Sequence, residues 1–170
     1  MINYSVNDVF LILGAALLAY AALHDIVART VDNRIAVAVA VCGLAAQFTH
    51  GTLLHALPAA LAVFVTAAFC WRFGWMGGAD VKLLAAAALL VPHGTVLPLI
   101  GATAIAGGLL ALPYLAARTR IPRPARSRPE ALLPRALRAE QWRLRRGGPL
   151  PYAVAIATGA LFVLSQGGPS

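Results

Sequence analysis

Charged residues are scarce in this chain of 170 residues: they make up 12% of it, while hydrophobic residues make up 60% and the mean hydropathy is +0.77. Soluble domains carry about 25% charged residues, so this scarcity excludes an ordinary soluble globular domain. The apolar residues come in long blocks that a lipid bilayer accepts as spans. The composition therefore predicts an all-α, polytopic membrane protein.

Cysteine is almost absent, and the chain has neither a CxxC pair nor a histidine cluster at metal-ligand spacing. Cys42 and Cys70 both fall inside predicted spans, where they suit small apolar packing positions. A disulfide framework and a structural zinc site therefore have no support in the sequence. We expect neither a metal nor a cofactor.

The net charge of +8 arises in one segment. Residues 118–148 hold ten arginines against two glutamates, while four basic and four acidic residues cancel in the remainder. The first part, RTRIPRPARSRPEALLP, is proline-rich and expected to be extended. The second, RALRAEQWRLRR, predicts a basic amphipathic helix with Leu137, Trp142 and Leu144 towards lipid. We expect this basic loop to orient the protein and bind anionic lipid headgroups, and we expect no nucleic-acid partner.

We predict about six transmembrane helices within one membrane domain of residues 1–170. The N-terminus MINYSVND has no basic region or cleavage site, so we expect the first apolar run to be a retained span. The short basic loop belongs in the cytoplasm by the positive-inside rule. Alternation then places both termini outside and loops 25–34 and 72–79 on the cytoplasmic face. The predicted spans are 7–24, 35–50, 53–71, 80–92, 94–117 and 149–166.

The fourth span is unusually short and carries charges at its start. From Ala79 to Val91 it has thirteen residues, or about 20 Å of helix against a hydrocarbon core of about 30 Å. If the helix begins below the membrane surface, Asp80 lies at hydrocarbon depth beside irregular backbone made by Gly77 and Gly78. Such backbone is tolerated only inside the protein or along a wet cavity. An aspartate and the chain's one lysine, Lys82, in this place predict a functional site.

Asp25 ends the first span and Asp80 begins the fourth, so both lie near the cytoplasmic face, where they can meet. Each has a structural explanation by itself, because Asp25 can pair with Arg29 and Asp80 can cap a helix. Two neighbouring carboxylates in a low-dielectric site, however, share a proton. One of them then takes a proton from an attacking water, and its partner donates to the peptide carbonyl oxygen.

Two other functions fit the same aspartates. A small transporter or channel component would use Asp25 and Asp80 as ion or proton sites, although no inverted repeat relates the two halves of the chain. A non-catalytic assembly subunit would use the aspartates only to pair with Arg29 and Lys82. That subunit would keep its function after neutral replacement of either aspartate.

Three stretches share one pattern with a known family. Asp25 followed by VDN at 31–33 is similar to D-x-R-x-x-x-I-P-N, GGADVKL at 77–83 is similar to G-x-G-D-V-K-L, and LPYAVAIATGAL at 150–161 is similar to P-Y-G-x-A-I-A-x-G. In this order and spacing the chain resembles the bacterial type IV prepilin peptidases, the leader peptidases of the GxGD aspartyl class. The likeness touches the first, fourth and last predicted spans.

The resemblance implies that Asp25 and Asp80 are the catalytic pair. Gly77, Gly78 and Ala79 would shape the loop before Asp80, and Lys82 and Asn33 would support the site or the substrate. Substrates would be prepilin or pseudopilin precursors, cut at the cytoplasmic face of the bacterial inner membrane for pilus biogenesis. The pilus assembly machinery is a further candidate partner. The small size resembles the Tad/Cpa branch, which processes Flp-type pilins, so we expect no methyltransferase activity.

The chain departs from the family pattern at several positions. Ala79 replaces the second glycine of GxGD, so we expect a loop conformation that a non-glycine residue tolerates. Asp32 replaces the usual proline and adds a third acid, which leaves the partner of Asp80 open between Asp25 and Asp32. Val27 and Ala153 replace a usual arginine and glycine. The basic loop would repel a basic leader, so we expect it to lie on lipid instead of lining the cleft.

Overall fold

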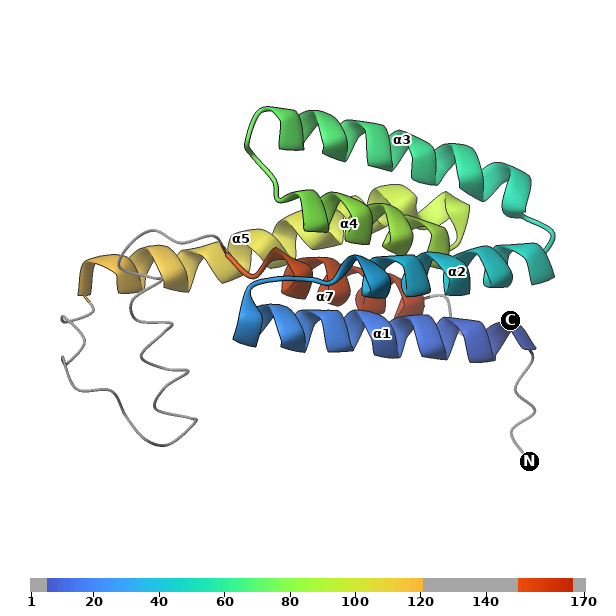
Figure 1. Cartoon of the computed structure of the whole chain (residues 1–170), viewed down its shortest axis with the longest axis horizontal. Helices are drawn as coiled ribbons and strands as arrows, with labels where there is room; N and C mark the ends of the chain where they lie inside the picture. Colours follow the sequence, from blue (N-terminus) through green and yellow to red (C-terminus); the bar gives the residue numbers. More distant parts are fainter. Residues whose placement is uncertain (1–5, 121–149, 167–170) are drawn as a thin grey trace. The chain divides into compact units, whose positions relative to one another are not determined.

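The computed structural model describes residues 6–120 and 150–166 (Figure 1). This part of the chain contains helices and connecting turns but no strand, which confirms the all-α class. Each predicted span overlaps a helix, with ends that differ by up to four residues. The helices are α1 (Val6–Ala28), α2 (Asn33–Thr49), α3 (Leu53–Arg72), α4 (Gly78–Leu90), η1 (His93–Thr95), α5 (Val96–Arg120) and α7 (Tyr152–Gln166). Residues 118–120, which were expected to begin the extended part of the basic loop, are instead the end of α5. The rest of that part and the expected amphipathic helix lie outside the described residues.

Three of the described helical segments are long and apolar enough to cross a membrane: Val6–Ala28, Leu53–Arg72 and His93–Pro113. The helices α2 and α7 are apolar but shorter. Large apolar side chains also cover the outward faces, with Leu54 and Leu97 among the most exposed. Helices that are apolar both inside and outside are typical of a membrane protein. The number of six crossings stays a prediction.

The chain divides into two compact units, which separate within α5. The first comprises residues 1–107 and 151–170, and the second comprises residues 108–150. The described part of the second unit is Leu150 and the C-terminal portion of α5, which contains Pro113. The apolar core and the candidate site both belong to the first unit.

The short helix α4 is the centre of the first unit. It packs against α2, α3 and α7, while α1 packs against α2 and α7. Its buried residues lie around most of the helix, while the face that carries Lys82, Ala85 and Leu89 is less buried, so protein and not lipid covers most of it. These buried residues are Val81, Leu83, Leu84, Ala86, Ala87, Ala88 and Leu90.

Two glycines allow neighbouring helices to approach the C-terminal end of α4 closely. A Cβ atom on Gly43 of α2 would lie 2.7 Å from the backbone carbonyl carbon of Leu89. A Cβ atom on Gly14 of α1 would overlap the Leu90 side chain. Small residues at such interfaces increase packing contact between membrane helices. The contacts hold α1 and α2 against the C-terminal end of α4.

Gln47 of α2 is buried and satisfies the backbone where α4 ends. Its Nε2 donates to the carbonyl oxygens of Leu89 at 3.0 Å and Val91 at 2.9 Å. Its Oε1 accepts a hydrogen bond of 2.6 Å from Thr52 Oγ1, which orients the amide. The last carbonyls of a helix have no partner within it, and Pro92 prevents α4 from continuing. Gln47 therefore allows a helix of thirteen residues to end inside the bundle.

Candidate active site

The turn before Asp80 is more regular than the sequence predicts. Helix α4 begins at Gly78, so Gly78 is helical, and the expectation of irregular backbone there is wrong. Gly77 is the N-cap, with extended φ and ψ of −73° and 143°. Ala79 lies in the first helical turn and does not have a positive φ. An alanine is therefore sterically acceptable where GxGD proteins have their second glycine.

Asp80 is the third residue of α4, and its half-buried carboxylate turns back onto Gly77. The carboxylate accepts a hydrogen bond from the backbone of Gly77. An acid at this position commonly reaches back to the N-cap N–H and closes the first turn. Asp80 therefore stabilises the start of α4, but it does so from the third helical position and not as the N-cap residue. That role also fixes where its carboxylate lies.

Asp25 lies in the last turn of α1, which continues to Ala28 instead of ending at residue 24. Its side chain is 6% exposed, and its Oδ2 accepts a hydrogen bond of 3.2 Å from the backbone N–H of Ala153. Ala153 is the second residue of α7, so this N–H has no partner within its own helix. The positive end of the α7 dipole favours a carboxylate at this point. The third motif of the sequence therefore supplies a backbone donor to Asp25.

The two carboxylates lie within electrostatic range of each other. Helix α1 contacts α4 directly, and α7 packs against both. The half-buried phenol of Tyr152, next to Ala153, is also within electrostatic range of Asp80. The C-terminal end of α1 and the N-terminal ends of α4 and α7 thus converge on a pair of acids. Sequence reasoning did not single out Tyr152, although it lies in the third motif.

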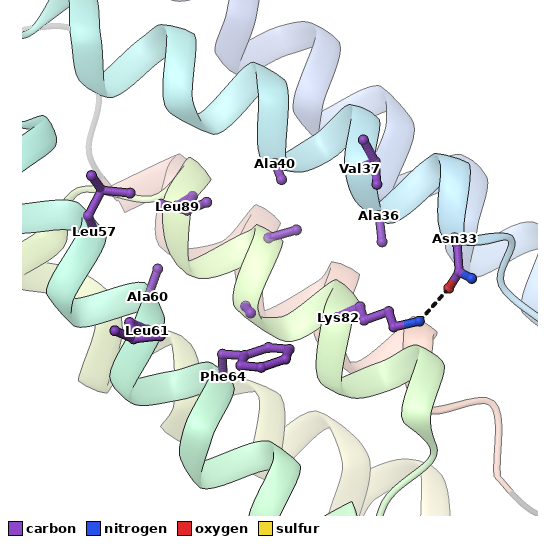
Figure 2. Close-up of a pocket in the computed structure, with 12 residues that line it drawn as sticks. Asn33, Ala36, Val37, Ala40, Leu57, Ala60, Leu61, Phe64, Lys82 and Leu89 are labelled. Atoms are coloured by element: carbon purple, nitrogen blue, oxygen red, sulfur yellow. Dashed lines mark hydrogen bonds between the residues drawn. The ribbon is translucent and has the colours of Figure 1, made fainter.

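Lys82 and Asn33 also come together, on another side of α4. Lys82 Nζ donates a hydrogen bond of 2.9 Å to Asn33 Oδ1 (Figure 2). Residues two apart on an α-helix are separated by about 200° around its axis. Lys82 therefore faces α2, whereas Asp80 faces the region of α1 and α7.

Asp32, the third acid of the sequence analysis, caps α2. Its exposed side chain accepts a hydrogen bond of 3.0 Å from the Arg34 backbone N–H, the usual role of an N-cap aspartate. The acid whose charge acts on Asp80 is Asp25. This electrostatic interaction makes Asp25 a better candidate than Asp32 for the partner of Asp80.

One further polar side chain near the site, His24, has a local role. His24 Nδ1 lies 2.7 Å from the Thr30 carbonyl oxygen, so the ring ties the end of α1 to the following loop. Across residues 6–120 and 150–166, no group of three or more His, Cys, Asp or Glu side chains is arranged to hold a metal ion. Within the described residues, the site offers two carboxyl groups, each held by a backbone donor.

Comparison with models of protein families finds a match. The model of the type IV leader peptidase family matches residues 12–112, which is more than half of the chain and includes both Asp25 and Asp80. The matched range ends before α7, whose first turn contacts Asp25. Searches of curated proteins and of solved structures each returned no significant match.

Proposed function

The chain belongs to the type IV leader peptidase family, and we propose that it is an aspartyl endopeptidase whose catalytic pair is Asp25 and Asp80. The observation that carries this proposal is the convergence of three helix ends on two carboxyl groups that act on each other electrostatically. Family membership supports peptide hydrolysis over the transporter or assembly-subunit alternatives.

The proposed chemistry needs one proton shared by the two carboxyl groups, since two carboxylates do not ionise easily together in a site of low dielectric. The ionised carboxylate removes a proton from water as the water oxygen attacks the peptide carbonyl carbon. The protonated carboxyl group gives its proton to the carbonyl oxygen. Collapse of the tetrahedral intermediate breaks the C–N bond, and the leaving nitrogen takes up the proton that came from water. One hydroxyl group of the intermediate returns its proton to the second carboxylate as the carbonyl reforms, which restores the starting pair.

Backbone groups would hold both acids in place during this reaction. The N–H of Ala153 holds Asp25, and the backbone of Gly77 holds Asp80. Donors built into a helix terminus are already oriented before the substrate binds, so little reorganisation is needed in the transition state. Gly78 and Ala79 would serve by forming the first turn of α4. Lys82 and Asn33 are proposed to contact the substrate.

The family suggests a prepilin-type substrate. We propose that its substrates are the precursors of Flp-type pilins, which it would cut at the cytoplasmic face of the bacterial inner membrane. In this orientation both termini lie outside and the basic loop lies on cytoplasmic lipid headgroups. No methyltransferase activity is proposed.

Cleavage of a tagged Flp-type prepilin, co-expressed with the protein and followed as a gel shift, tests the proposal. Asp25→Asn and Asp80→Asn should each abolish cleavage without lowering the amount of protein in the membrane. Asp32→Asn is the matched control and should still cut, because asparagine also caps helices well. Cleavage that survives Asp80→Asn would exclude the aspartyl mechanism. Loss with Asp32→Asn in place of Asp25→Asn would move the partner to Asp32.

A further inference from the structure

A groove with a volume of about 520 Å³ lies between α2, α3 and α4. Both α2 and α3 pack against α4 but contact each other little, so α4 forms the floor of the groove (Figure 2). Along α4, the lining runs from Lys82 through Ala85 and Ala86 to Leu89. This spacing follows one face of the helix for two turns, or about 10 Å. The groove therefore begins beside the charged end of α4 and runs away from it.

The shape and composition of the groove fit an apolar helix. Its deeper positions are occupied by small residues, such as Ala36 and Ala60, which are buried. Large exposed side chains, such as Val37 and Leu61, stand at its edges. Small residues in a membrane-helix interface let a second helix approach closely, and large residues beside them pack along its flanks.

One end of the groove is polar and carries a positive charge. Lys82 is exposed, and the bond described for its ammonium group is to the uncharged amide of Asn33. An ammonium group at the edge of an apolar membrane groove is stabilised by a negatively charged partner. This charge disfavours the arginine-rich basic loop of the same chain as the occupant, since like charges repel. It favours an apolar helix that brings a carboxylate to Lys82.

We infer that this groove binds the apolar helical segment of the substrate, with an acidic side chain of that segment paired to Lys82. The inference rests on the proposed function, because it assigns the groove to the protein that Asp25 and Asp80 cut. Lys82 follows Asp80 by two residues, so a chain that leaves the groove at Lys82 reaches the N-terminal end of α4 at once. Since the two side chains face different sides of α4, the substrate must pass around this end as extended chain. An extended segment presents its peptide bond to the two acids.

Photo-crosslinking in the full-length protein tests this inference. The Asp80→Asn variant, which should leave the substrate uncut, receives p-benzoylphenylalanine in place of Val37, Leu61 or Phe162. The first two positions line the groove, and Phe162 is a similarly exposed control on α7. The tagged Flp-type precursor should crosslink from Val37 and Leu61 at least ten times more than from Phe162. Lys82→Met should lower the yield, and so should an amide in place of the acidic residue in the apolar segment. The two changes together should lower it no further than either alone.

Crosslinks to lipid only, or equal yields from all three positions, would overturn the inference. Equal yields with and without Lys82→Met would overturn the role of Lys82. These failures differ from failure of the proposed function. If the unmodified protein does not cut the precursor, the proposed function fails. If it cuts the precursor but the groove positions do not crosslink to it, only the groove assignment fails.

Discussion

At the scale of single residues, Gly77 matters through the space it leaves open and not through its backbone conformation. Its φ and ψ are open to any L-residue, yet a Cβ atom there would lie 2.8 Å from Asp80 Oδ2. We predict that Gly77→Ala folds normally but displaces the Asp80 carboxylate. Cleavage by the purified variant in detergent should fall about 10²-fold, as expected for a misplacement of about 1 Å at a reacting group.

Gly78→Ala is the matched control for this change. A Cβ atom at Gly78 would lie 3.3 Å from Nε1 of Trp71, an exposed side chain that has room to move aside. Its cleavage rate should stay within a few-fold of the parent. If Gly77→Ala cuts as fast as Gly78→Ala, the position of the Asp80 carboxylate does not depend on the space at Gly77.

At the scale of elements, the ending of α4 depends on a side chain from another helix. Gln47→Leu keeps a similar volume but leaves the carbonyls of Leu89 and Val91 without their donor. We predict a loss of about 1–3 kcal/mol in the free energy of unfolding, the cost of unsatisfied buried acceptors. Unfolding in mixed micelles with increasing sodium dodecyl sulfate measures this difference.

Thr66→Val serves as the control for Gln47→Leu. Thr66 is exposed, and its hydroxyl group donates to Ala62 within the same helix. Its replacement should change the free energy of unfolding by less than about 0.5 kcal/mol. Equal stability of the two variants would show that the carbonyls at the end of α4 have other partners.

The helices themselves can be predicted from the sequence, because each apolar block has the length of a helix. Their ends are harder to predict, as α1 shows. A charged residue suggests the end of a span, but α1 continues past Asp25 to Ala28 and stops where Arg29 adopts a φ of 56°. Inside the protein, the Asp25 carboxyl group accepts a hydrogen bond from the N–H of Ala153 in α7. That donor is a backbone N–H group 128 residues away in the sequence. A pattern of side chains does not predict that it contacts Asp25.

The residues of the candidate site could also be predicted from the sequence, whereas some of their contacts could not. Asp25 and Asp80 were predicted from membrane depth and from family motifs, and the fold places them within electrostatic range. The contact between Lys82 and Asn33 joins two of those motifs directly. The capping role of Asp32 depends on where α2 begins, which apolar periodicity locates only to within a few residues.

At the scale of the whole molecule, the orientation in the membrane is the main open prediction. The arginines of residues 118–148 should hold this loop in the cytoplasm, with the C-terminus on the other side. We predict that alkaline phosphatase fused after Ser170 is active, whereas a fusion after Arg128 is inactive. Green fluorescent protein at the same two positions should give the reverse pattern. Activity of the phosphatase at Arg128 would invert the proposed topology and place the acids at the outer face.

The proposed mechanism depends above all on Asp25 and Asp80 acting as one proton-sharing unit. The most direct test is the single-turnover cleavage rate of purified Asp25→Asn, Asp80→Asn and the double variant on the same precursor. We predict that each single change lowers the rate by about 10⁴-fold or more and that the double change lowers it no further, because groups that act together lose their effect together. Losses that multiply in the double variant, or a single variant that cuts at the parent rate, would contradict the claim.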